Sequence, residues 1–474
     1  MPEAANRPTP NPLSQLPSID ELLQSDDLAR PIAECGTLRV TKWARLAVEH
    51  LRSELLGSPQ ADPVNKHALA EAAVVLIKEH QDAFSQSLLS GVINATGVVI
   101  HTNLGRAPLS ENAKRAIAET AAGYCTLEYN VASGKRGKRG RGAEELIASL
   151  TGAEAAVVVN NCAAAAFLTL TATAAGREVV ISRGELVEIG GDFRVPDVLA
   201  RSGCILKEVG TTNRTKLADY EKAIGENTAM LLRVHPSNYR IIGFTSSPGN
   251  EELAALAKAN GIVFFEDAGS GALVDLSEFG LGDEPLISRS VAEGADLVAF
   301  SGDKLLGGPQ SGIIVGRQDL IETIRRYPLY RALRPDKLTY AALEETLLAY
   351  ERGTHFDEIP VLQMLSMPEA EIEMRARAFA DELIGKLPEG RSFEIDVTRG
   401  ESAIGGGSAP GVHPETTLIA LTGRGTSAED IERRLRRGTP PVIARIAEDQ
   451  VLIDLRTVRP EQESVVIDSI AGLA

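Results

Sequence analysis

One lysine and one aspartate stand where two buried strands are expected to end. Lys304 follows an apolar strand expected over residues 297–300, and Asp267 follows another such strand 37 positions upstream (304 − 267). The carboxyl ends of parallel strands share one edge of a sheet, so the two side chains are expected to lie together. An imine-forming amine opposite a carboxylate that faces a ring nitrogen is the arrangement that pyridoxal 5′-phosphate requires. The pair therefore predicts a site for this cofactor.

Each residue taken alone has a plainer explanation. A lysine after a strand is usually solvated, and Asp267 in Asp-Ala-Gly-Ser-Gly could equally be a helix cap or a turn former. Ser301 favours the cofactor, because its hydroxyl, three residues before Lys304, can reach the phosphate. Buried beside a cationic ring, the amine of Lys304 would be partly neutral and therefore nucleophilic.

The cofactor phosphate is expected at a strand-to-helix junction. Asn161, Cys162 and Ala163 follow the apolar residues 155–159 and precede a helical pattern. The free amides of a helix N-terminus point at an anion placed there. A simple polar turn explains the same residues as well, so this assignment depends on Lys304 and Asp267.

Two further segments carry arginines without an evident role in a core. Arg106 ends His-Thr-Asn-Leu-Gly-Arg, and Arg331 and Arg334 are spaced to share one helix face. Arginine forks match the oxygens of tetrahedral anions, although surface ion pairs are the alternative. Arg139 lies in the basic run 135–141, whose cations could also contact RNA phosphates.

Composition indicates a globular protein of two or three domains. The 474 residues are 43% hydrophobic and 24% charged, and the formal net charge of −16 opposes any general attraction to polyanions. The four cysteines are far apart and have no histidines at metal-ligand spacing, which favours a reducing cytoplasm and no metal. The start of the chain lacks a secretory pattern, and no membrane span is expected.

Three domains are expected: a tail and helical domain over 1–84, a cofactor-binding domain over 85–345, and a small α+β domain over 346–474. In the first, Thr41 is expected to cap a helix that ends near Gly57. In the second, strands alternate with helical patterns, which is typical of a mostly parallel sheet with helices on both faces. The expected strands cover residues 155–159, 178–182, 205–209, 229–234, 262–265, 297–300 and 313–315.

Four ordered motifs connect these residues to a known family. They are Ile-Asn-Ala-Thr-Gly to Asn-Leu-Gly-Arg-Ala-Pro-Leu over 93–109, Gly-Lys-Arg-Gly over 134–137, Glu-Asp-Ala-Gly-Ser-Gly over 266–271, and Ser-Gly-Asp-Lys-Leu-Leu-Gly-Gly-Pro-Gln over 301–310. With them the chain closely resembles the bacterial L-seryl-tRNA(Sec) selenium transferases over nearly its whole length.

The resemblance implies a fold-type I pyridoxal phosphate enzyme that forms a homo-oligomeric ring of dimers. It implies that Lys304 holds the cofactor and Asp267 its ring nitrogen. It also implies that the selenium donor, selenophosphate, faces four arginines: Arg106, Arg139, Arg331 and Arg334. Asp303 resembles an active-site position of the family without a role readable from sequence. The amino-terminal helical domain is expected to help bind seryl-tRNA(Sec).

The implied reaction begins with an external aldimine of the seryl ester and eliminates its β-hydroxyl. Selenium then adds to the resulting aminoacrylyl-tRNA. His101 and His235 are both candidates for the acid that protonates the leaving hydroxide. One alternative is a pyridoxal phosphate lyase of a free amino acid or amino sugar, which would not need residues 1–84. Another is a nucleic-acid-binding scaffold built on residues 135–141, which the net negative charge disfavours.

Overall fold

The computed structural model describes residues 12–57, 65–188, 194–388, 390 and 392–473. The chain divides into two compact units, here called the helical unit (Met1–Gly91) and the large unit (Val92–Ala474). Among the described residues, no helix has both the length and the apolar character needed to cross a bilayer.

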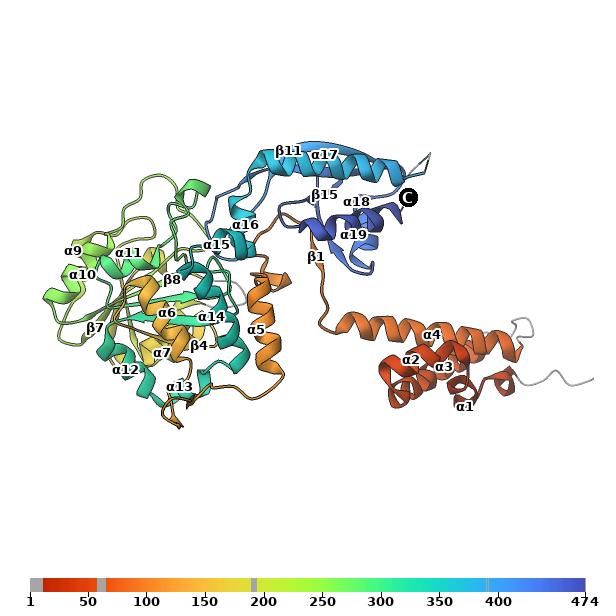
Figure 1. Ribbon diagram of the computed structural model, residues 1–474, viewed down its shortest axis with the longest axis horizontal. Coiled ribbons are helices and arrows are strands. Elements are labelled where there is room, and N and C mark those ends of the chain that lie inside the picture. Colours follow the sequence, from red (N-terminus) through yellow and green to blue (C-terminus); the bar gives the residue numbers. More distant parts are fainter. Residues whose placement is uncertain (1–11, 58–64, 189–193, 389, 391, 474) are drawn as a thin grey trace, which may run out of the picture. The chain divides into compact units, whose positions relative to one another are not determined.

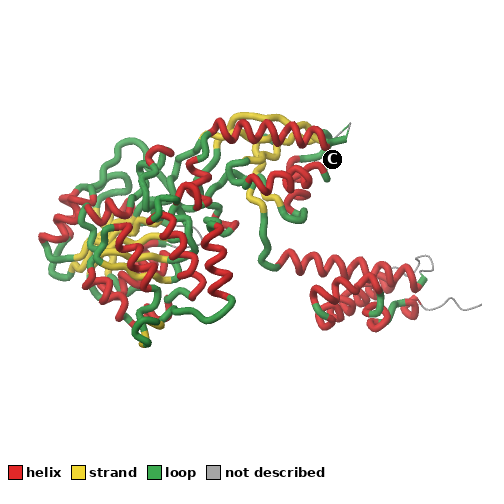
Figure 2. The backbone as a smooth tube through the Cα atoms, in the orientation of Figure 1, coloured by secondary structure: helices red, strands yellow, loops and turns green. Residues whose placement is uncertain are grey.

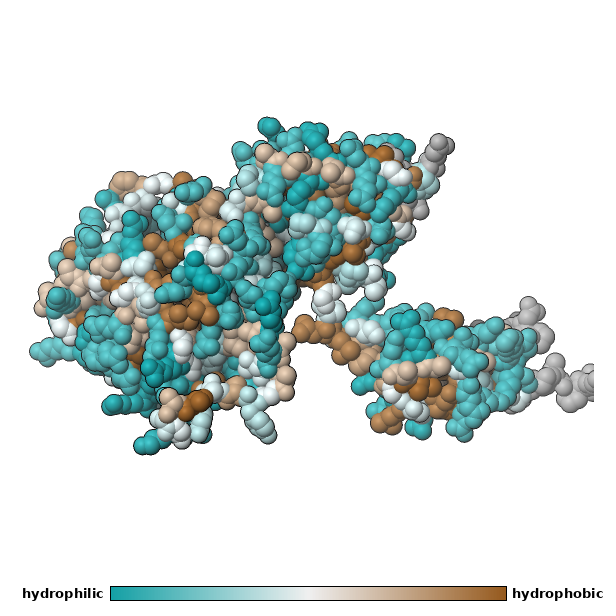
Figure 3. All heavy atoms as spheres, in the orientation of Figure 1, coloured by the Kyte–Doolittle hydropathy of each residue, from teal (hydrophilic) through white to brown (hydrophobic). Residues whose placement is uncertain are grey.

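The helical unit is built from α1 (Ile19–Leu23), α2 (Ala29–Cys35), α3 (Thr37–Gly57) and α4 (Lys66–Ser87). Ser18 caps α1, and Glu21 completes a reciprocal capping box with it. A core that includes Leu22, Trp43 and Ile77 fills the space between the helices, and its members all come from this unit. On the face drawn in Figure 3, hydrophilic residues cover most of this unit's surface. Such a unit has the closed core that independent folding requires.

The expected cap at Thr41 is wrong. Helix α3 begins at Thr37, and the Thr41 hydroxyl lies inside the helix, where it donates a hydrogen bond to the carbonyl oxygen of Thr37 over 2.7 Å. The expected end near Gly57 is confirmed.

The large unit contains a seven-stranded sheet with the order β4-β10-β9-β8-β7-β5-β6. The strands are β4 (Ala155–Val159), β5 (Glu178–Ser182), β6 (Ile205–Val209), β7 (Thr228–Val234), β8 (Val263–Gly269), β9 (Leu297–Ser301) and β10 (Gly312–Gly316). Strands β6, β5, β7, β8 and β9 run parallel, and β10 is antiparallel to both of its neighbours. The mostly parallel sheet is confirmed.

Helices cover both faces of this sheet (Figures 1 and 2). The strand residues alternate between two cores: Leu231 and Phe264 belong to one, and Leu232 and Phe265 to the other. This period of two is what a strand buried on both faces produces. The helices up to the end of this layer are α5 (Glu111–Ala121), α6 (Arg141–Thr151), α7 (Cys162–Ala174), α8 (Val195–Arg201), α9 (Leu217–Ala223), α10 (Asn250–Ala259), α11 (Ile287–Ala292), α12 (Gln318–Arg326), α13 (Pro328–Leu333), α14 (Lys337–Glu351), α15 (His355–Glu358) and α16 (Pro360–Ser366).

A second, antiparallel sheet follows, with the order β11-β12-β15-β14. Its strands are β11 (Phe393–Glu401), β12 (Glu415–Gly423), β14 (Arg445–Ala447) and β15 (Gln450–Asp454), and its helices are α17 (Glu369–Lys386), α18 (Ala428–Arg436) and α19 (Pro460–Ala471). A separate core that includes Phe379, Ile419 and Ile467 joins them. The small α+β region and the helical amino-terminal region expected in the fold class are thus both present. The expected limit at 345 falls inside α14, and the three-domain division stays a prediction.

The first residues of the large unit pair with its last third. Strand β1 (Ile93–Asn94) lies parallel to β13 (Val442–Ile443), and Val98 forms a bridge with Ala403. A short hairpin, β2 (Tyr129–Asn130) and β3 (Lys135–Arg136), precedes α6.

Candidate active site

The lysine and the aspartate do lie at one edge of the main sheet. Ser301 is the last residue of β9, and Asp267 is inside β8, which ends at Gly269 and not at the expected residue 265. The register between β8 and β9 shifts between Asp267 and Gly269, a bulge that changes the direction of the chain beside the site. Lys304 is only 5% exposed and Asp267 only 9%. Both side chains are therefore largely withdrawn from water.

The wall next to Lys304 comes from a segment that is about a hundred residues away in sequence. The Nζ atom of Lys304 donates to the carbonyl oxygen of Gly407 over 3.3 Å. Gly407 has φ +79°, and a Cβ there would lie 3.1 Å from Nζ and 3.5 Å from the Oγ atom of Ser237. Only glycine allows this close approach without strain. This wall was not predicted from the sequence, although three consecutive glycines at 405–407 were a signal for it.

The electrostatics of Asp267 suit a partner with a positive charge. Burial raises the pKa of its carboxyl from 3.8 to about 6, although the nearby charge of Lys304 and the thiol of Cys162 lower it. The Sγ atom of Cys162 lies 3.6 Å from Oδ1 of Asp267. Burial, and next the charge of Asp267, raise the pKa of the Cys162 thiol well above its usual range. The thiol is therefore neutral and donates to the carboxylate.

Helix α7 begins where the phosphate was expected. Asn161 is the N-cap, and its side chain accepts a hydrogen bond from the amide of Ala164 over 2.8 Å. The amides of Cys162 and Ala163 lie in the first turn, where no helical carbonyl can accept from them. A Cβ on Gly312 of the adjacent β10 would collide with the carbonyl oxygen of Asn161, so the strand packs directly against the junction. The contact between Cys162 and Asp267 brings this junction to the carboxylate that was expected to face the cofactor ring.

Arg106 contacts Asp303, the residue directly before Lys304. Its Nη1 atom lies 2.9 Å from Oδ2 of Asp303, and the carbonyl oxygen of Asp303 accepts from the amide of Ala107 over 3.2 Å. Arg106 has φ +62°, an uncommon backbone conformation for a residue with a side chain. Such strain is typical of functional sites. The structure therefore joins Arg106 to Asp303, the residue that resembles an active-site position of the family.

Arg139 and Arg334 meet on a carboxylate that the sequence analysis did not identify. The Oε1 atom of Glu128 lies 2.7 Å from Nε of Arg139 and 3.3 Å from Nη1 of Arg334. The Arg139 guanidinium contributes most to lowering the pKa of Glu128. Arg136 also pairs with Glu128 from the basic run. No local pattern links Glu128 to Arg334, which is 206 positions away.

The expected helix face of Arg331 and Arg334 is wrong. Helix α13 ends at Leu333, and Arg334 has an extended backbone with ψ 135°. Arg334 precedes Pro335, and the proline ring excludes the helical conformation from the residue before it. Arg331 remains in the helix, is exposed, and forms no ion pair with the described residues.

The two candidate acids differ in their surroundings. The backbone amide of His235 donates to the carbonyl oxygen of Asp267 over 2.9 Å, and its Nε2 atom lies 3.4 Å from Oε1 of the buried Glu284. Glu284 also accepts from the amide of Ala409, two residues beyond Gly407. The Nδ1 atom of His101 is buried and has no partner among the described residues. His235 is thus the histidine that the structure connects to Asp267.

A cavity of about 780 Å³ adjoins this wall. Its lining includes His235, Glu284 and Ala409, and it follows the carboxyl ends of β5, β7 and β8. Ligands of parallel sheets bind at such edges. Among the described residues, no group of three histidine, cysteine, aspartate or glutamate side chains is placed to hold a metal ion.

Comparisons with known proteins agree with these motifs. The family model for L-seryl-tRNA selenium transferase matches residues 92–459. The L-seryl-tRNA(Sec) selenium transferase of Geobacter sulfurreducens is 44% identical over 463 residues, which cover 97% of this chain and 99% of that protein. The protein of the same name from Alkaliphilus metalliredigens is 45% identical and covers 98% of each chain.

A solved structure supports the fold alone. The structure of D-glucosaminate-6-phosphate ammonia-lyase matches 82% of this chain and 97% of its own, with a TM-score of 0.57 and 23% sequence identity. The fold-type I class expected from the sequence is therefore confirmed. From the family match and the full-length relatives together, the chain belongs to the L-seryl-tRNA selenium transferase family and is a transferase of this type.

Proposed function

We propose that this protein converts L-seryl-tRNA(Sec) to L-selenocysteinyl-tRNA(Sec) in the cytoplasm, with selenophosphate as the selenium donor. Pyridoxal 5′-phosphate is the proposed cofactor. One observation carries the proposal: the amine of Lys304 and the carboxylate of Asp267 are buried together, and close enough for the lysine charge to lower the aspartate pKa. That pair stands in a chain of the selenium transferase family.

The residues at the sheet edge fit this cofactor. Asp267 would face the ring nitrogen, because a carboxyl whose pKa burial raises gains most from a cationic partner. Ser301 and the first-turn amides of Cys162 and Ala163, capped by Asn161, would hold the phosphate. When bound, the cofactor supplies an electron-accepting ring that stabilises negative charge at the α-carbon of the seryl ester.

Lys304 has two tasks in this proposal. Its Nζ atom holds the cofactor at rest, and the freed amine takes the α-proton of the seryl ester once the substrate is bound. The buried wall at Gly407 excludes water around this atom. Asp303, which pairs with Arg106, would connect the lysine segment to the donor site.

The direct test is the complete reaction. Incubation of the purified protein with serine-charged tRNA(Sec), selenophosphate and pyridoxal phosphate should yield selenocysteine esterified to the tRNA, identified by mass spectrometry. Free serine in place of the charged tRNA is the control. Conversion of free serine or of an amino sugar, without conversion of the charged tRNA, would instead support a small-molecule lyase.

Arginines are proposed to bind the selenium donor. Arg331→Ala and Arg334→Ala should each raise KM for selenophosphate about tenfold or more, because each removes a charge-assisted contact to an oxyanion. Arg326→Ala is the matched control, since Arg326 is exposed at the end of α12 and outside the proposed set. If both test variants keep a KM for selenophosphate close to that of the parent protein, the proposal that these arginines bind the donor is wrong. Arg106 and Arg139 complete the proposed set.

The helical unit is proposed to bind the tRNA. Its core uses only its own residues, and the cores of the large unit use only residues after Val92. A chain that starts at Val92 should therefore fold and load the cofactor. Its kcat/KM for serine-charged tRNA is expected to fall about a hundredfold, through loss of binding energy remote from the chemistry. Undiminished turnover of the charged tRNA by this truncated chain would contradict the role.

A homo-oligomer, a ring of dimers, is also proposed. Several large apolar side chains of the large unit are exposed in the single chain, among them Tyr124, Ile242 and Phe244. Figure 3 shows hydrophobic areas between hydrophilic ones on this unit. Exposed apolar surface favours association between protein chains. Light scattering of the purified protein would measure the mass of the assembly.

A further inference from the structure

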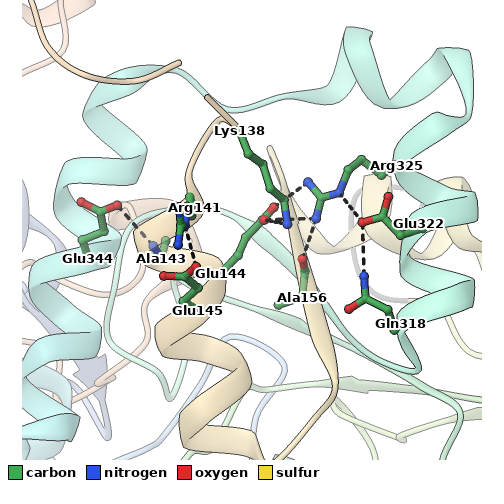
Figure 4. Close-up of polar contacts among 10 residues, drawn as sticks. All are labelled: Lys138, Arg141, Ala143, Glu144, Glu145, Ala156, Gln318, Glu322, Arg325 and Glu344. Atoms are coloured by element: carbon green, nitrogen blue, oxygen red, sulfur yellow. Dashed lines mark hydrogen bonds and ion pairs between the residues drawn. The ribbon is translucent and has the colours of Figure 1, made fainter. Parts of the chain in front are cut away.

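One buried carboxylate on α6 gathers three contacts. Glu144 is 3% exposed and lies in the first turn of α6 (Figure 4). Both of its oxygens accept from Arg325, each over 3.0 Å, and its Oε2 atom lies 2.8 Å from Nζ of Lys138. Arg325 also donates to the carbonyl oxygen of Ala156 in β4 over 2.9 Å. Helix α6, strand β4 and helix α12 therefore meet at the ion pair of Glu144 and Arg325.

The contacts of Glu144 join the two segments that carry the arginines proposed to bind the selenium donor. Lys138 is the direct neighbour of Arg139. Arg325 is near the end of α12, immediately before α13, which carries Arg331 and leads to Arg334. Glu128 ties the same two segments a second time, through Arg139 and Arg334. Arg139 is thus held through its own guanidinium by Glu128, and its neighbour Lys138 is held by Glu144.

The charges of this cluster depend on one another. Burial raises the pKa of the Glu144 carboxyl, and the charges of Arg325 and Lys138 oppose that effect. A buried charge is tolerated only when it is paired and hydrogen-bonded. The bidentate geometry fixes the guanidinium of Arg325, whereas Lys138 reaches in from a partly exposed position. Loss of Lys138 would leave the pair of Glu144 and Arg325 intact and would release only the loop that carries Lys138 and Arg139.

We propose that Glu144 is a positioning residue for the selenium donor: through Lys138 and Arg325 it sets Arg139 against Arg331 and Arg334. It touches none of these arginines and acts through their neighbours in the chain. This inference rests on the proposed function, because it concerns the arginines assigned there. An anion site that is spread over two distant segments needs such a tie, since small displacements weaken charge-assisted contacts strongly.

The experiment compares two adjacent carboxylates of one helix. Glu144→Gln is expected to raise KM for selenophosphate about tenfold while kcat at saturating donor stays within about twofold. Glu145→Gln is the matched control, because Glu145 is exposed and pairs only with Arg141 in Figure 4. KM for the charged tRNA and the absorbance of the bound cofactor are measured in parallel and should stay unchanged, which a general loss of structure would not allow.

A milder variant keeps the test decisive if Glu144→Gln does not fold. Lys138→Met removes the exposed link alone and should raise KM for selenophosphate severalfold. Equal KM values in Glu145→Gln and the two test variants would overturn the inference. If Arg331→Ala and Arg334→Ala also leave KM unchanged, the assignment of the donor site itself has failed. If Arg331→Ala and Arg334→Ala raise KM for selenophosphate and Lys138→Met does not, only the positioning role of Glu144 has failed.

Discussion

Replacing Lys304 with Ala is expected to reduce the conversion of seryl-tRNA(Sec) about a thousandfold or more, because in the proposed mechanism its Nζ atom both anchors the cofactor and moves the α-proton. The variant should still bind pyridoxal phosphate through Asp267 and the α7 N-terminus. It should lack the visible absorbance of a lysine-bound cofactor. Turnover is measured with serine-charged tRNA and the absorbance by spectrophotometry.

The control for Lys304→Ala is Lys304→Arg, which keeps the positive charge but cannot bond covalently to the cofactor. Both variants should be inactive if the covalent role is essential, whereas a purely electrostatic role would spare the arginine variant. A small amine added to Lys304→Ala should restore part of the activity by taking over the proton transfer. Borohydride treatment of the parent protein should place the cofactor on the peptide that contains Lys304. Labelling of a different lysine would contradict the assignment.

Asp267→Asn is expected to reduce kcat about a hundredfold or more, because a neutral amide no longer keeps the ring nitrogen protonated. The same variant should make the cofactor-free protein more stable. Burial raises the carboxyl pKa from 3.8 to about 6, so between about pH 4 and pH 6 the folded protein holds a proton that the unfolded chain has already lost. Ionising this carboxyl at pH 7 therefore costs the fold up to about 3 kcal/mol.

The effect of Asp267 on the stability of the cofactor-free protein should depend on pH. The stability of the cofactor-free parent should fall as pH rises from about 4 to about 6, and Asp267→Asn should lack that part of the decrease. Below about pH 4 the two proteins should differ little. Chemical unfolding of both cofactor-free proteins across this range measures the difference. A less stable Asp267→Asn protein at pH 7 would show that the carboxylate is stabilised without the cofactor.

Much of the fold was predictable because local patterns produce it. Strands buried on both faces are continuous apolar runs, so most strands of the main sheet could be placed closely. The edge strand β6 was also placed, although it is less apolar and partly exposed. The polar end of β8 could not be predicted, because Glu266 and Asp267 look like the start of a loop. In the structure, β7 and β9 pair with both residues. The cap expected at Thr41 was wrong because a threonine inside a helix can donate to the carbonyl oxygen four residues earlier, here that of Thr37, whereas a cap accepts from a backbone amide.

The burial of Lys304 and Asp267 at one edge of the main sheet was predictable, and their supporting contacts were not. Lys304 and Asp267 follow apolar strands, and that placement is visible in the chain itself. The contacts of Glu128 with Arg334 and of Lys304 with Gly407 join residues far apart in sequence, and no local pattern indicates them. The error at Arg334 had a signal, because Pro335 follows it and ends the helix.

The pairing of the beginning of the large unit with its last third orders events during synthesis. Val98 meets Ala403, and Gly407 covers the amine of Lys304 from a position 103 residues later. The ribosome therefore synthesises Lys304 long before the segment around Gly407 that covers its amine. The amine of Lys304 is therefore covered only when translation is nearly finished, and a product that terminates before Gly407 would leave this amine exposed.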